Sequence, residues 1–196
     1  FCPMEEAYRD IFEGAMVCLI CPTATAAAVI TGKLGGSAST LTTYTLLSNV
    51  LAAIAVPLVF PLVEPHADIT FVVAFLKILS KVFPLLLAPF FIALLFRYYI
   101  PSVHRLLSKY HGVAFYLWAV ALTIVTGQTV RSLVTAAADV SIEIMIALAG
   151  LATCCLQFYF GKRIGSAYHD RISAGQALGQ KNTVLAIWMA VTYLNP

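Results

Sequence analysis

The residues best suited to chemistry lie in a polar interruption near the end of an otherwise apolar sequence. Within residues 173–190, the side chains of Gln176, Gln180, Lys181 and Asn182 stand among alanines, leucines and glycines. Polar, glycine-containing backbone is tolerated at membrane depth only where it is buried in protein or lines a cavity. An ionisable group in such a place indicates function, and an ammonium among amides suits the carboxylate of an organic anion.

A second interruption lies near the start of the chain, in residues 21–36. Pro22 has no backbone N–H and clashes with the preceding turn, so it frees carbonyls near Cys18. Thr23 and Thr25 add hydroxyls beside this break. Freed carbonyls hold cations and half-helix N-termini attract anions, so two interrupted helices together predict a transport site. The residues predicted to bind substrate are Thr23, Thr25, Gln180, Lys181 and Asn182.

Each interruption also has a structural interpretation. The first is then a proline kink with close helix packing. The second is then a loop, with the last helix beginning only at Thr183. A helix over residues 183–194 would extend for about 18 Å, well short of the ~30 Å hydrocarbon core. The polar group around Lys181 is therefore expected inside the membrane, either within a span or at the break of a half-helix.

The elements that must position these residues are apolar helices. The chain is 61% hydrophobic and 11% charged, with a mean hydropathy of +0.90, whereas soluble domains are about 25% charged. The net charge of +3 is small and scattered, which argues against nucleic-acid binding. Lipid-embedded backbone must satisfy its hydrogen bonds internally, which favours helices. Six spans are predicted, at about residues 11–30, 41–63, 78–99, 113–134, 140–160 and 174–194.

The basic residues predict the orientation of the spans, because cytoplasmic loops are enriched in Lys and Arg. Seven basic residues follow spans one, three and five, and two lie on the opposite side: Lys33, Arg97, Arg105, Lys109, Lys162, Arg163 and Arg171, against Arg9 and Arg131. The first and last spans then run in opposite directions, as in inverted repeats. The sequence thus predicts an all-α membrane protein, an inverted-repeat bundle with two broken, crossing helices. Residues 1–69 would end the first repeat and residues 70–196 would form most of the second.

Two other residue pairs have spacings that deserve a chemical interpretation. Lys77 and Lys81 share one helical face, which favours a short interfacial helix with both ammonium groups at the lipid headgroups; a functional intramembrane pair is the alternative. Cys18 and Cys21 have CxxC spacing, but no second Cys or His pair accompanies them. We interpret these thiols as small hydrophobic residues, with no metal or other cofactor expected.

Other membrane functions lack their sequence signatures. No acid or histidine lies deep in a predicted span, and the histidines, placed in loops, are His66, His104, His111 and His169. No HExxH or GxSxG motif occurs, so an enzyme is not predicted. No repeated filter or charged ring indicates a channel. A membrane sensor derived from a transporter fold remains an alternative.

Three stretches resemble the bile acid:sodium symporter family and its bacterial relatives. CPTATAAAVITGKLGGSASTLTTYTLLSNVLAAIAVPL, from residue 21, is similar to that family's fourth and fifth helices, where Cys-Pro-Gly-Gly-Thr-Ala-Ser-Asn is usual. KILSKVFPLLLAPF resembles the start of its sixth helix. YFGKRIGSAYHDRISAGQALGQKNTVLAIWMA resembles its ninth, where Glu-x-Gly-x-Gln-Asn is usual. The resemblance covers helices four to nine of ten; auxin-carrier and cation/proton antiporter relatives share the general plan.

This resemblance implies a carrier of organic anions that works by alternating access, with two sodium ions near the crossing helices. Thr45, Gln176, Lys181 and Asn182 occupy the expected ion-site positions. The family's Ser-Asn pair falls on Ala27 and Ala28, its glutamate on Ala177 and its glutamine on Lys181. Because alanines offer a hard cation no side-chain oxygen, we expect a carrier that is not coupled to sodium, with Lys181 supplying the positive charge and a proton as the alternative coupling ion. The expected location is a bacterial inner membrane, and the expected partners are lipid and a small carboxylate.

Overall fold

The protein is a bundle of apolar helices. The computed structural model describes residues 3–63, 70–110, 112–135, 140–190 and 192. These residues are helical apart from the connections and one isolated β-bridge, which confirms the predicted all-α class. The helices are α1 (Pro3–Ile20), α2 (Ala27–Lys33), α3 (Ala38–Val63), α4 (Phe71–Tyr99), α5 (Pro101–Lys109), α6 (Val113–Thr135), α7 (Val140–Ala167), α8 (Arg171–Gly179) and α9 (Thr183–Met189).

Within the described residues, four helices are long and apolar enough to cross a membrane: α3, α4, α6 and α7. Two further predicted spans are each divided into two shorter helices, α1 with α2 and α8 with α9. The first of these begins earlier than expected, because α1 includes the charged residues that precede the apolar segment. Within α1 the Arg9 Nε donates to Glu13 Oε1 at 2.8 Å, and this ion pair accompanies the burial of Glu13.

The third predicted span is longer than the sequence suggested. A separate interfacial helix carrying Lys77 and Lys81 was expected, but both residues belong to the first three turns of α4. No glycine or proline lies between Phe71 and Phe83, so nothing divides this segment from the rest of the helix. The interfacial-helix prediction is therefore wrong, and both ammonium groups lie on the span's own helix.

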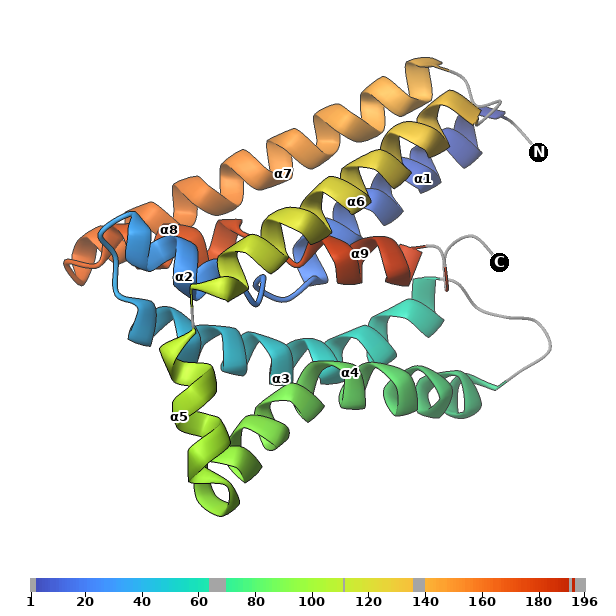
Figure 1. Ribbon diagram of the computed structural model, residues 1–196. Helices are drawn as coiled ribbons and strands as arrows, with labels where there is room; N and C mark the ends of the chain where they lie inside the picture. The colour runs from blue at the N-terminus through green and yellow to red at the C-terminus, as the bar shows by residue number, and fades with distance from the viewer. Residues whose placement is uncertain (1–2, 64–69, 111, 136–139, 191, 193–196) are drawn as a thin grey trace.

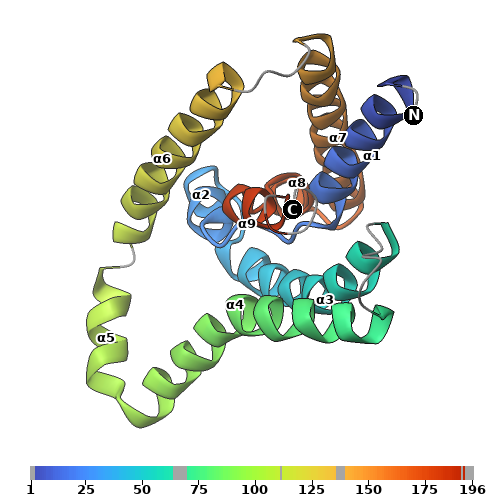
Figure 2. The ribbon, with the colours of Figure 1, turned by 90° about the vertical axis from the view of Figure 1, so that its right-hand side faces the viewer.

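The connection after α4 contains a helix that the sequence interpretation treated as a loop. Pro101 begins α5, where its fixed φ and missing N–H suit the first helical position. His104 consequently lies in a helix and not in a loop; His66 and His111 are outside the described residues. Figure 2 shows α5 and α6 standing at the edge of the bundle, where α6 contacts α2.

The breaks of the two interrupted helices, together with α2, α8 and α9, lie at the centre of the bundle (Figure 2). One flank is formed by α3 with α4, and the other by α7 with α1 (Figures 1 and 2). In Figure 1, α2 and α8 share one end of the bundle, whereas α1 and α9 extend toward the other. The core around them includes Cys21, Val56, Phe60, Val82 and Met189, each no more than 1% exposed.

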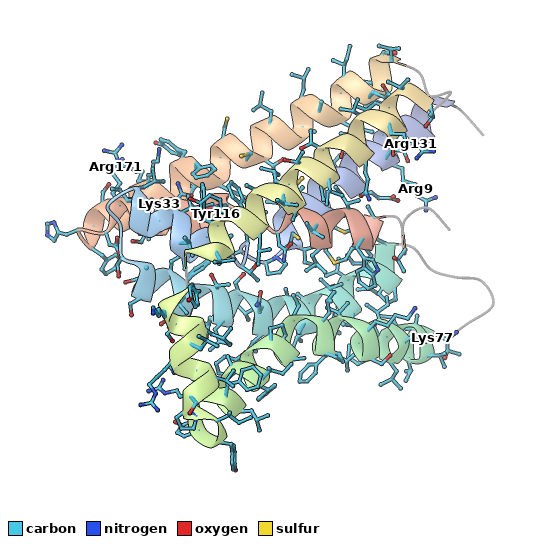
Figure 3. The ribbon with its side chains drawn as sticks, viewed as in Figure 1. Arg9, Lys33, Lys77, Tyr116, Arg131 and Arg171 are labelled. Atoms are coloured by element: carbon cyan, nitrogen blue, oxygen red, sulfur yellow. The ribbon has the colours of Figure 1, made fainter. Side chains whose placement is uncertain are left out.

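Four of the basic residues used to predict the orientation lie at two opposite ends of the bundle (Figure 3). Lys33 and Arg171 lie at the end of the bundle that holds α2 and α8, and Arg9 and Arg131 lie at the opposite end (Figure 3). Lys77 lies at that second end as well. If the α2–α8 end faces the cytoplasm, the positive-inside bias is satisfied.

Candidate functional site: the crossover and the adjoining cavity

The two helix breaks cross and hydrogen-bond to each other. The isolated β-bridge joins Thr23 to Lys181 in antiparallel fashion. Ala24 N donates to Gln180 O at 2.9 Å, and Asn182 N donates to Pro22 O at 2.9 Å. Each unwound segment therefore satisfies part of the other's backbone, which is what allows irregular backbone among apolar helices.

The carbonyls freed at the end of α1 receive side-chain donors from distant parts of the chain. Pro22 has no N–H for Cys18 O, and this carbonyl accepts instead from Gln157 Nε2 at 3.2 Å. The next carbonyl, Leu19 O, accepts from Lys181 Nζ at 3.2 Å. The predicted interruption at Pro22 is thus present, and an amide and an ammonium occupy the freed carbonyls.

Thr23 is fully engaged within the crossover. Its N–H donates to Ser48 Oγ at 3.0 Å, and its hydroxyl donates to Ala177 O at 2.7 Å. It is only 1% exposed. Cys21 is equally buried, and its thiol donates to Asn182 O at 3.1 Å. Both side chains hold the two breaks together, so neither presents a free group to a ligand.

A cavity of about 570 Å³ opens beside the crossover, between α3, α4 and α9. This volume lies in the range of pockets that bind small molecules. Three of the predicted site residues line it, namely Thr25, Thr45 and Asn182. Its full lining is Thr25, Ala28, Thr42, Thr45, Leu46, Asn49, Lys81, Leu85, Leu86, Pro89, Phe90, Asn182, Val184, Leu185 and Trp188.

The other predicted site residues do not line this cavity. The Lys181 ammonium is directed to the end of α1, and Thr23 is buried in the crossover. Gln180 Oε1 is buried with no partner in the described part of the chain. Gln176 is half-buried on α8, and its carbonyl accepts from Gln180 N at 2.9 Å. Asn182, which does line the cavity, uses its side-chain oxygen to cap α9, accepting from Leu185 N at 3.1 Å.

Comparison with known families shows to which family the chain belongs. Residues 6–136 match the sodium bile acid symporter family, and they include the first broken helix, α3 and α4. The chain belongs to the sodium bile acid symporter family. It is therefore a multi-pass integral membrane protein and a transporter of the bile acid symporter type, and members of the family are transporters rather than enzymes. Searches of curated proteins and of solved structures gave no significant match.

The family match confirms the resemblance drawn from the sequence, and it ends before α7. The second break, with Gln180, Lys181 and Asn182, lies beyond the matched residues, so its correspondence to the symporter family's ninth helix stays a prediction. At the ion-site positions of the resemblance, Ala27 and Ala177 are buried and carry no side-chain oxygen.

Three polar residues of the cavity were not among the predicted site residues: Thr42, Asn49 and Lys81. Asn49 follows Thr45 by four residues, so both lie on one face of α3. This spacing was a signal that the sequence offered. Lys81 was assigned to the headgroups because its neighbours gave no indication that a cavity adjoins it.

Proposed function

We propose that the chain carries a small organic anion across a bacterial inner membrane by alternating access and without sodium coupling. The observation that carries this proposal is the contact of Lys181 Nζ with Leu19 O, 3.2 Å apart. A freed carbonyl at a helix C-terminus is a place that attracts a cation. Here the fixed ammonium of Lys181 supplies the positive charge at that place.

The composition around the crossover supports the same conclusion. Hard cations such as sodium need several oxygen ligands at short range. Ala27, Ala28 and Ala177 supply no side-chain oxygen, and the Thr23 hydroxyl is already donated to Ala177 O. An ammonium at the same centre also repels a second cation.

The opposite directions of the two broken helices support alternating access. In the proposal, residues 1–69 and 70–196 belong to two inverted repeats whose breaks meet at the crossover. A change in how α3 and α4 pack against the crossover would open the cavity to one side or the other. The net positive charge of the cavity and crossover favours an anionic substrate, and proton exchange at Lys181 is the proposed alternative to sodium for coupling.

Transport in reconstituted vesicles tests the proposal. Uptake of labelled cholate is measured in proteoliposomes with an inward gradient of sodium, and again with sodium replaced by N-methylglucamine. We expect equal uptake in the two buffers, and a pH gradient should alter it if a proton replaces sodium. Uptake that requires sodium overturns the proposed coupling.

Variants of Lys181 test the residue that carries the proposal. Lys181→Met should abolish uptake, Lys181→Arg should retain the charge and part of the activity, and Lys77→Met is the matched control on the outer turns of α4. Each variant is first checked for a monodisperse profile in detergent. If a folded Lys181→Met variant takes up cholate as fast as the wild type, Lys181 has a structural role only, as the donor to Leu19 O.

A further inference from the structure

The short helix α5 has two faces of different chemistry. Its large apolar residues recur at positions i, i+3, i+4 and i+7 and therefore share one side of the helix: Val103, Leu106, Leu107 and Tyr110. Arg105 and Lys109 lie on the opposite side, together with Ser102. A short helix with an apolar face and a basic face is typical of a segment that lies in the membrane interface.

The rest of the described chain leaves both faces of α5 open. No residue of this helix is buried, and Leu106, Leu107 and Tyr110 are each 55–56% exposed. Arg105 and Lys109 are exposed on the other side. An apolar face and a basic face that are both open can be covered at once by lipid, because acyl chains meet the first and headgroups meet the second.

The charge on this part of the chain has one sign. No Asp or Glu occurs between Asp68 and Asp139, a stretch that contains all of α4, α5 and α6. Within the described residues, Arg105 and Lys109 form no ion pair with a carboxylate. The two side chains are four residues apart, so they stand one turn from each other and can contact the same anionic headgroup.

The direction of α5 suits a position along the membrane surface. The chain turns between Tyr99, where α4 ends, and Pro101, where α5 begins. In Figures 1 and 2, α5 runs across the direction of α4, and in Figure 1 it lies at the end of the bundle that holds α2 and α8. A helix that runs across the preceding span at the end of a bundle is placed to lie in the interface rather than to cross the bilayer.

Tyrosines mark the same level of the bundle. Tyr98 and Tyr99 end α4, Tyr110 follows α5 and Tyr116 lies in the first turn of α6, and all four are more than half exposed. Tyr116 lies at the end of the bundle that holds Lys33 (Figure 3). Tyrosine is enriched where the membrane meets water, because its ring is apolar and its hydroxyl is polar. These side chains place the headgroup region at α5.

We infer that α5 is an interfacial helix that binds an anionic phospholipid of the cytoplasmic leaflet. The Arg105 guanidinium and the Lys109 ammonium contact the phosphate group of the lipid, and the side of the helix that carries Leu106 and Leu107 lies among the acyl chains. The long stems of both basic side chains let their charged ends reach the headgroups. This surface differs from the crossover and its cavity, so the inference does not depend on the proposed substrate or coupling ion.

Native mass spectrometry of the full chain in detergent tests the choice of lipid. The chain is titrated with phosphatidylglycerol, which is anionic, and with phosphatidylcholine of the same acyl chains, which has no net charge. We expect phosphatidylglycerol to bind more tightly. Arg105→Gln combined with Lys109→Gln should weaken its binding about 30-fold, or about fivefold for each basic residue near an anionic surface, and leave phosphatidylcholine binding unchanged.

The matched control removes two exposed basic residues from the opposite end of the bundle. Lys77→Gln combined with Arg131→Gln should bind phosphatidylglycerol as the wild type does. Both double variants are first checked for a monodisperse profile. Equal binding of the two lipids by the wild type would overturn the inference, as would equal phosphatidylglycerol affinity of the two double variants. Displacement of the lipid by an equal concentration of inorganic phosphate would indicate a site for a soluble anion and would overturn it as well.

Spin labels in vesicles that contain phosphatidylglycerol test the placement of the apolar face. In a chain without its native cysteines, a label on Leu107→Cys should be accessible to oxygen dissolved among the acyl chains and shielded from a water-soluble nickel chelate. A label on Ser102→Cys, on the basic face, should show the reverse. A label at position 107 that the chelate reaches would place this face in water, and one shielded from both reagents would show that protein covers it; either result overturns the inference.

Discussion

The contact between α7 and α8 allows the sharpest prediction about how the crossover is held in place. Gly161 on α7 is buried against the backbone of α8. A Cβ added at Gly161 would lie 2.5 Å from Ala174 O and 3.0 Å from Gly175 Cα. Both are backbone atoms, so no side-chain rotation relieves the clash. Gly161→Ala should therefore push α8, and with it the second break, away from α7.

The size of the effect follows from two opposing contributions. Alanine is favoured over glycine in a helix by about 0.5–1 kcal/mol, and overpacking costs about 1–3 kcal/mol. Gly150→Ala is the matched control, because Gly150 lies on the same helix and an added Cβ would meet no atom of the described residues within 4 Å. The difference between the two variants isolates the steric cost. At about 2–4 °C per kcal/mol for a chain of this size, Gly161→Ala should melt about 2–12 °C below Gly150→Ala.

Thermal unfolding of both variants in the same detergent measures this difference, and uptake by reconstituted vesicles measures its functional consequence. We expect Gly150→Ala to match or exceed the wild-type melting temperature and to transport normally. Gly161→Ala should have a lower melting temperature and lose uptake, because Gln180 and Lys181 directly follow the displaced α8. Indistinguishable melting of the two variants would refute the close α7–α8 contact on which the reasoning depends.

Two further predictions concern the freed carbonyl of α1 and the orientation of the chain. Gln157→Leu removes the side-chain donor to Cys18 O, so the free energy of unfolding should fall by about 0.5–1.5 kcal/mol, the net contribution of one hydrogen bond. Gln128→Leu on the exposed surface of α6 should melt like the wild type, and equal melting of the two variants would contradict the assigned bond. The orientation is tested in a chain whose native cysteines have been replaced. There, Ser102→Cys should react with an impermeant maleimide only from the cytoplasmic side, and Thr135→Cys only from the outer side. Labelling of both cysteines from one side would disprove the predicted topology.

Several features followed from the sequence because their causes are local. A proline removes its own N–H, so the break at Pro22 was visible without knowledge of its neighbours. Hydropathy is likewise a sum over adjacent residues, and it indicated the four long helices. Three stretches of sequence, the first beginning at Cys21, suggested the symporter family, which the match over residues 6–136 confirms.

Other features were missed because they depend on the orientation of helices about their own axes. α4 is apolar on nearly every side, so no stripe in its sequence distinguishes the face that meets a cavity from the face that meets lipid. On α3 the first half is rich in Ser and Thr all round, and the spacing of Thr45 and Asn49 was not recognised among them. Lys81 was therefore placed at the headgroups, and Asn49 was not singled out. For the same reason, the sequence did not reveal that α4 runs without a break from Phe71.

The sequence by itself determined that this chain is a membrane-embedded helical transporter with a break at Pro22 and a polar interruption around Lys181. Only the tertiary structure decided what those polar groups meet. Lys181 reaches Leu19 O, and Gln157 reaches Cys18 O, across more than a hundred intervening residues. Such partners are fixed by how helices distant in the chain pack together, which no local pattern of residues encodes.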